Sequence, residues 1–210
     1  RDCLLSRGLG DVYKRQNPNP IPRRRLVVFY IFFAHLTGCA WYAFGVVEAH
    51  SVVGSKDGKG IPGYTTYRLS LQLSGDAANV YTTYGTANSE MNLPAAYQCA
   101  APFGGNTGGT NVAFWAIANN AALGFAQFDS WLTVGVTDGS AAGAIASTGI
   151  DFASWTEESG LDVPDGAVFW MDPAAAPAPG EGGTVVVAQL TVPAGESGQM
   201  TAGAQGQSAD

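Results

Sequence analysis

Within residues 65–73, apolar and polar side chains alternate from Thr66 to Leu73. The odd positions from Tyr67 to Leu73 are apolar, and the even positions from Arg68 to Gln72 are polar. Successive side chains of an extended chain point to opposite faces, so this two-residue period predicts a strand with one buried face.

Further apolar runs of strand length follow, separated by clusters of Gly, Asn, Asp and Pro. The predicted strands lie within residues 79–85, 111–118, 124–136, 144–152, 166–172 and 184–192. The predicted turns lie at residues 74–76, 104–109, 138–139 and 165–166. No amphipathic helix of ordinary length stands out in this part of the chain. The pattern predicts an all-β fold over residues 50–210, an antiparallel β-sandwich of the jelly-roll or Ig-like kind. No strand is predicted in residues 194–210, and we expect that the domain is truncated before its last strand.

The segment 17–49 has the layout of a signal for export. Three arginines, Arg23 to Arg25, precede an uncharged apolar run over residues 26–47. Small side chains near Ala49, and again near Ala40, fit a signal-peptidase site. The run is also long enough to span a bilayer, so the segment is a signal peptide or a retained membrane anchor helix. Either alternative places the rest of the chain outside the cell, and membrane contact is expected only through residues 26–47 if they are uncleaved.

Charge narrows the function further. No lysine, arginine or histidine occurs after Arg68, whereas 13 carboxylates do. Residues 50–210 carry three cations against 14 carboxylates, a net charge of −11. Such a field repels nucleic acid and anionic lipid. A Ser-His-Asp relay or a lysine Schiff base has no residues to form it there. We therefore expect a non-enzymatic protein, with glycoside hydrolysis as the least unlikely enzymatic alternative.

The candidate binding residues are aromatic. Trp115, Trp131, Trp155 and Trp170 fall in four different strand-like segments, and Asp129 lies beside Trp131. A sugar-binding face would present such rings flat to solvent, whereas a sandwich core would bury them with their N–H groups bonded. Both alternatives stay open, with Asp129, Trp131, Trp155 and Trp170 as the candidate ligand-binding residues.

Two other kinds of site are weaker. Asp162, Asp165 and Asp172 surround one predicted turn and strand and could offer oxygen ligands to calcium, although their spacing matches no EF-hand loop. Cys99 is the one cysteine after residue 49, and a small buried thiol is the simpler interpretation than a reactive one. No other cofactor is expected.

Two parts of the chain resemble known sequences. The opening RDCLLSRGLGDVYKRQ (residues 1–16) resembles translated sequencing-adapter read-through, and we expect it to be an artefact that takes no part in the fold. The segments NLPAAYQCAAPFGG, FDSWLTVG and VVVAQLTVP resemble an uncharacterised secreted domain of marine microalgae and bacteria, over residues 64–193. That resemblance implies an extracellular β domain and transfers no site residue.

Three functions follow as hypotheses. The first is an exported surface, adhesion or matrix domain that binds other surface proteins or glycans. The second is a carbohydrate-binding module that uses exposed Trp residues, and the third is a calcium-dependent structural module.

Overall fold

The computed structural model describes residues 50–51, 60–73, 75–141, 143–196 and 198–209. The predicted artefact (1–16) and the predicted signal peptide or anchor (17–49) lie outside these described residues. None of the helices in the described residues has both the length and the apolar character needed to cross a bilayer.

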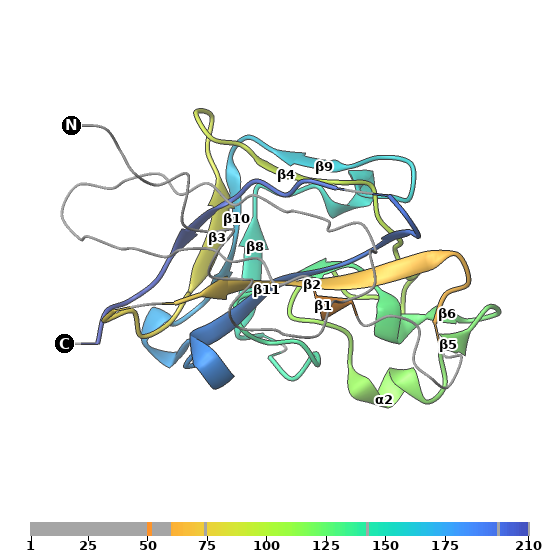
Figure 1. The fold of residues 1–210 in the computed structure, drawn as a ribbon, viewed down its shortest axis with the longest axis horizontal. Helices are drawn as coiled ribbons and strands as arrows, with labels where there is room; N and C mark the ends of the chain where they lie inside the picture. The colour runs from red at the N-terminus through yellow and green to blue at the C-terminus, as the bar shows by residue number, and fades with distance from the viewer. Residues whose placement is uncertain (1–49, 52–59, 74, 142, 197, 210) are drawn as a thin grey trace, which may run out of the picture.

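The described chain is mostly β, with antiparallel strand pairs in every sheet and few helical turns (Figure 1). The strands are β1 (His50–Ser51), β2 (Tyr64–Gln72), β3 (Thr82–Gly85), β4 (Met91–Leu93), β5 (Asn119–Asn120), β6 (Gly124–Phe125), β7 (Trp131–Leu132), β8 (Ile145–Thr148), β9 (Leu161–Val163), β10 (Gly166–Trp170), β11 (Thr184–Pro193) and β12 (Gly203–Gln205). The helical segments are α2 (Val112–Trp115) and the 3-10 turns Ala126–Phe128, Phe152–Ser154, Pro173–Ala175 and Glu181–Gly183. The predicted all-β class is therefore confirmed.

Two four-stranded sheets carry most of the pairing. The first sheet has the strand order β1-β2-β11-β7, and the second sheet has the order β12-β3-β10-β8. The pairs β4–β9 and β5–β6 form two smaller sheets. The longest register joins β2 to β11, from Gln72 opposite Thr184 to Tyr64 opposite Pro193, with one irregularity between Val186 and Ala188.

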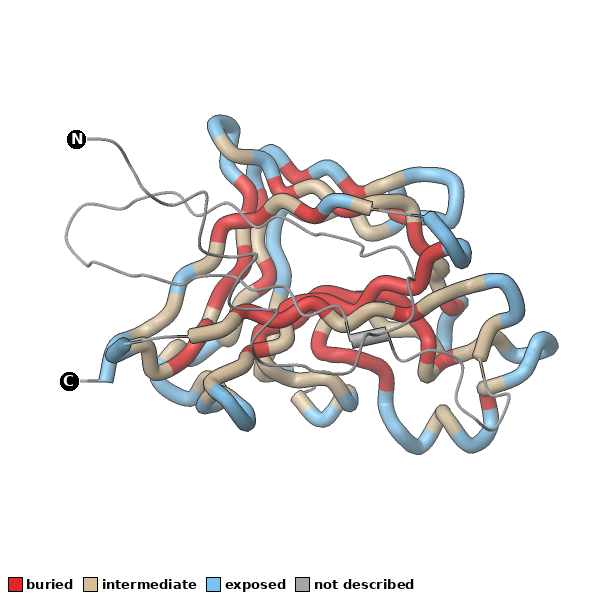
Figure 2. Tube along the Cα trace, viewed as in Figure 1, coloured by how far each residue is buried: buried red, intermediate tan, exposed pale blue. Residues whose placement is uncertain are grey.

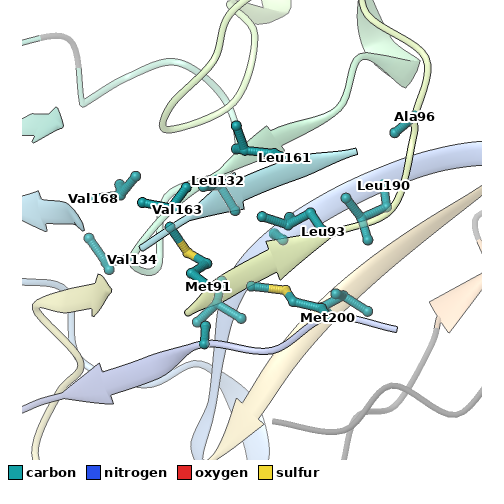
Figure 3. Close-up of a cluster of buried hydrophobic side chains, with 14 of the residues drawn as sticks. Met91, Leu93, Ala96, Leu132, Val134, Leu161, Val163, Val168, Leu190 and Met200 are labelled. Atoms are coloured by element: carbon teal, nitrogen blue, oxygen red, sulfur yellow. The ribbon is translucent and has the colours of Figure 1, made fainter. Parts of the chain in front are cut away.

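One hydrophobic core joins both large sheets and the β4–β9 pair. Leu69 and Leu190 reach it from the first sheet, Val168 from the second, and Met91 and Leu161 from the small pair. Figure 3 shows Leu190, Val168, Met91 and Leu161 converging from separate elements. Hydrophobic burial across the elements thus stabilises the described body, at roughly 25 cal/mol per Å² of apolar surface removed from water.

The alternation predicted for residues 65–73 is confirmed, with one qualification. Leu69 and Leu71 are fully buried in the core, as expected. The opposite face is also covered, because Thr66 and Ser70 are buried, and β11 is buried over most of its length (Figure 2). The polar face of β2 is therefore not exposed to solvent, because another layer of the chain packs on it.

Several local predictions were wrong. Within residues 111–118, Val112–Trp115 form the short helix α2 instead of a strand, and the Asn111 side chain caps it by accepting a hydrogen bond from the Ala113 N–H. Residues 124–136 do not form one strand but β6, a 3-10 turn and β7. The strands β4, β9 and β12 were not predicted, and β12 lies within the segment for which no strand was expected.

Candidate binding surface

Residues 97–128 form a lobe that contains no Asp, Glu, Lys, Arg or His. This segment, called the uncharged lobe from here on, includes α2, β5 and β6, which lie together at one end of the molecule (Figure 1). It has its own small core, in which Cys99, Ala118 and Ala126 are buried against Phe103, Phe114 and Trp115. The rings of Phe103 and Phe114 meet edge to face with centroids 5.4 Å apart.

Exposed apolar side chains gather on the uncharged lobe. Four large hydrophobic side chains are exposed among the described residues, and three of them belong to the lobe: Val112 at 51%, Ile117 at 55% and Leu123 at 45%. Local bonds connect their turns, because the Ile117 N–H donates to the Phe114 carbonyl, and the Asn120 side-chain amide donates to the Ile117 carbonyl. Three large exposed apolar side chains within one short segment make this segment the leading candidate for an interaction surface among the described residues.

The rest of the described surface is acidic. Every Asp and Glu among the described residues is exposed except Asp129. Two of these carboxylates border the lobe. The Tyr64 hydroxyl, which donates to Glu157, belongs to a ring 6.1 Å from that of Tyr97. Asp138 precedes Gly139, whose N–H donates to the Gly108 carbonyl. The uncharged lobe is thus a partly apolar segment with two carboxylates, Glu157 and Asp138, near its borders; these two are called its acidic rim below.

Asp129 holds the base of the lobe. One carboxylate oxygen accepts hydrogen bonds from the N–H groups of Cys99 at 2.7 Å and Ser130 at 3.0 Å. The other oxygen accepts from the Gly105 N–H at 2.7 Å. Burial raises the pKa of Asp129 to about 7, and the three N–H donors offset that rise only in part. The side chain is 1% exposed, so this carboxylate ties two loop segments together from inside the protein.

Further bonds attach the lobe to β11. The Gln189 side-chain amide donates to the carbonyls of Gln127 and Asp129, at 3.1 and 2.8 Å. The Tyr97 N–H donates to the Thr191 carbonyl, and the Thr191 N–H donates to the Ser130 hydroxyl. Since buried polar groups are costly when unpaired, this network fixes the position of the lobe on the polar face of the first sheet.

Arg68 is the only lysine or arginine among the described residues. Its Nε donates to the Gln189 side-chain carbonyl at 3.0 Å, and its guanidinium carbon lies 5.9 Å from the centre of the Trp131 ring. Burial lowers the pKa of Arg68. The Arg68 guanidinium therefore contacts Gln189 and Trp131 on the first sheet, and we do not expect it to bind an anionic partner from outside.

Cys99 carries a free, buried thiol. Burial, assisted by the nearby Asp129 carboxylate, raises the pKa of Cys99 to about 11. The thiol is therefore protonated at neutral pH, and a protonated, buried thiol is a poor nucleophile. Its surroundings favour the packing role.

The predicted ligand-binding residues fall mostly in the interior. Trp131 and Trp155 are each 1% exposed, and Asp129 is equally buried. The Trp155 ring N–H donates to the Pro94 carbonyl at 2.9 Å, as expected of a core tryptophan. Trp170 is half-buried and packs on the core. The structure brings Asp129 and Trp131 together at the base of the lobe but leaves Trp155 and Trp170 elsewhere, so these four residues form no shared platform.

The three predicted calcium ligands also stand apart. Asp162, on β9, accepts a hydrogen bond from the Asn92 side-chain amide at 2.7 Å. Asp165 lies before β10, and Asp172 lies after it, where its side chain accepts from the Ala174 N–H. A five-residue strand advances roughly 16 Å, so Asp172 does not share a site with the other two. Among the described residues, no group of three or more His, Cys, Asp or Glu is arranged to hold a metal ion.

The uncharged lobe was not identified from the sequence, although its signal was present. Between Glu90 and Asp138 the only carboxylate is Asp129, in a chain otherwise dotted with acids. Such a gap in the charge distribution marks a surface from which charge is excluded.

Comparison with known proteins adds no relative. No protein-family model, no curated protein and no solved structure matches this chain.

Proposed function

We propose that this chain is an exported, non-enzymatic surface, adhesion or matrix domain, located outside the cell or at its surface, that makes contact through the uncharged lobe. The observation that carries the proposal is the concentration of exposed Val112, Ile117 and Leu123 on a lobe without charge. Interface centres are depleted of charged residues and enriched in apolar and aromatic ones, as this lobe is.

The remaining support comes from the sequence and the sheet arrangement. The basic and apolar layout of residues 17–49 favours export, and the absence of Lys, Arg and His after Arg68 disfavours most catalytic mechanisms. Two four-stranded antiparallel sheets that contribute to one core favour a β-sandwich, the finer fold that we propose.

A carbohydrate-binding module is the second candidate, favoured by one residue of the lobe. Trp115 is only partly buried, and its ring N–H is held by the Thr110 hydroxyl at 2.9 Å. A fixed, partly exposed indole is a suitable stacking surface for a neutral sugar. Under this hypothesis Trp115→Ala would abolish binding to immobilised glycans, and urea unfolding of the variant separates a lost stacking surface from a disturbed lobe core.

The test uses the full chain with a tag after Asp210, expressed in a secreting eukaryotic cell line. We expect the protein in the medium or on intact cells, and stronger attachment of those cells to matrix-coated surfaces. Ile117→Asp should reduce the attachment, whereas Met171→Asp should not. Met171 is the matched control, because it is 61% exposed and lies outside the lobe, directly after β10. Retention inside the cell, or hydrolysis of polysaccharides by the purified chain, would contradict the proposal.

A further inference from the structure

We infer that the uncharged lobe binds a second copy of the same lobe, so that two chains associate lobe to lobe. The inference rests on the proposed function, because it names the partner of the contact surface proposed there. It is carried by the distribution of charge around the three exposed apolar side chains Val112, Ile117 and Leu123.

The charge on the rest of the described surface disfavours most pairings of two copies through that surface. All the described carboxylates except Asp129 are exposed, and Arg68 lies on the first sheet with its charge directed to Gln189 and Trp131. Two acidic faces repel each other, because no cation of the described surface stands between them. An acidic face against the uncharged lobe would desolvate carboxylates without a counter-charge, which is also unfavourable. Among pairings of the described surfaces, lobe against lobe brings Val112, Ile117 and Leu123 into the contact without burying a charge of residues 97–128.

The lobe is also suited to a two-fold contact. In an isologous dimer the same patch of each chain contacts its copy, so the charges of the patch must not repel each other. A patch without charge meets this condition automatically, whereas a charged partner of another kind would find no counter-charge on residues 97–128. The bonds from Asp129 and Gln189 hold the lobe on β11 in the free chain, so little ordering is needed when two copies meet.

The acidic rim predicts how such a dimer responds to salt. Glu157 and Asp138 border the lobe, so two rims approach each other when the lobes meet. Their repulsion is screened as the ionic strength rises, because the screening length falls from about 14 Å near 50 mM to about 4 Å near 500 mM. Self-association through the lobe is therefore expected to strengthen with added salt.

The experiment is sedimentation equilibrium of the purified full chain over a range of protein concentrations, at about 50 mM and about 500 mM NaCl. We expect a monomer–dimer equilibrium that tightens with salt. Ile117→Asp and Leu123→Asp should each weaken the dimer by about tenfold or more, because each places a carboxylate in the contact. Met171→Asp should change the dissociation constant less than about twofold. Each variant is prepared in the same way as the unchanged protein, so any association through residues 26–47 is common to all and cancels in the comparison.

Three results would overturn the inference. They are a chain that stays monomeric at the highest concentrations, a lobe variant that associates as tightly as the unchanged protein, and a dimer that weakens with salt. Urea unfolding of each variant separates a lost contact from a lost fold. Cell attachment that depends on Ile117 without self-association would sink the lobe-to-lobe pairing while leaving the proposed adhesion function standing.

Discussion

Removing the charge of Asp129 is expected to remove a pH dependence of folding stability. The pKa of this carboxyl group rises from an ordinary value of 3.8 to about 7 in the folded protein, chiefly because the side chain is buried. Each unit of difference corresponds to about 1.4 kcal/mol, so the whole effect is about 4 kcal/mol. Because the folded pKa is the higher one, the contribution to stability is complete below about pH 4 and is lost as the pH rises through about 7. Between pH 5 and pH 8 the expected loss is about 2–3 kcal/mol.

The assay is urea unfolding of the full chain, followed by tryptophan fluorescence at several pH values from 5 to 8. Asp129→Asn should flatten the pH dependence. The same substitution leaves one acceptor oxygen where there were two and turns an NH₂ group toward the Gly105 N–H, at a pH-independent cost of about 1–3 kcal/mol. The slope with pH is therefore the diagnostic quantity, and the absolute stability is not.

The control is Asp165→Asn, which removes one carboxylate that is exposed. The pH dependence of unfolding free energy in this variant should match that of the unchanged protein. The repulsion among the remaining carboxylates is nearly the same in the two proteins. If Asp129→Asn loses as much stability between pH 5 and pH 8 as the unchanged protein and the control do, the buried carboxylate is not the source. A protein that becomes more stable over that range would refute the sign.

Three other predictions concern the core, the base of the lobe and metal binding. Trp155→Phe should cost about 2 kcal/mol of unfolding free energy, because it leaves a gap and an unpaired Pro94 carbonyl; an unchanged urea midpoint would contradict this. Gly104→Ala should destabilise by at least about 2 kcal/mol, since the added Cβ would lie 1.9 Å from the Cys99 carbonyl oxygen, whereas Gly180→Ala meets nothing nearer than 3.5 Å and should be almost neutral. Adding EDTA should leave the melting temperature unchanged and adding calcium should not raise it, and a calcium-dependent rise would instead support the calcium module.

The long strands could be predicted from the sequence because their pattern of apolar residues extends over many positions. Residues 65–73 alternate over four apolar positions, and residues 184–192 are an unbroken β-favouring run; both became strands, β2 and β11. The strands β4 and β9 have three residues each, with one polar residue between two buried ones. A pattern this short cannot be distinguished from a loop, so these strands depend on tertiary pairing with each other.

The errors and the missed site have physical causes too. Residues 111–118 look like a strand by composition, yet Val112–Trp115 form a short helix that the Asn111 side chain caps. Asp129 and Trp131 were predicted as a pair that could meet a ligand, and the structure uses both in the interior, with the carboxylate bonded to three backbone N–H groups. A single sequence does not distinguish a buried carboxylate from a solvated one, because burial depends on which distant segments cover it.

The pairing of β2 with β11 has a consequence for the order in which the chain is completed. Every residue of β2 that is paired with β11 lies more than one hundred positions before its partner. The central hydrogen bonds of the first sheet, and the attachment of the uncharged lobe to Gln189 and Thr191, therefore wait until residue 193 has been synthesised. Until then β2 has an open edge on that side, which is a template for wrong pairing. Contacts so distant in sequence form slowly, so we expect the first sheet to be completed late in folding.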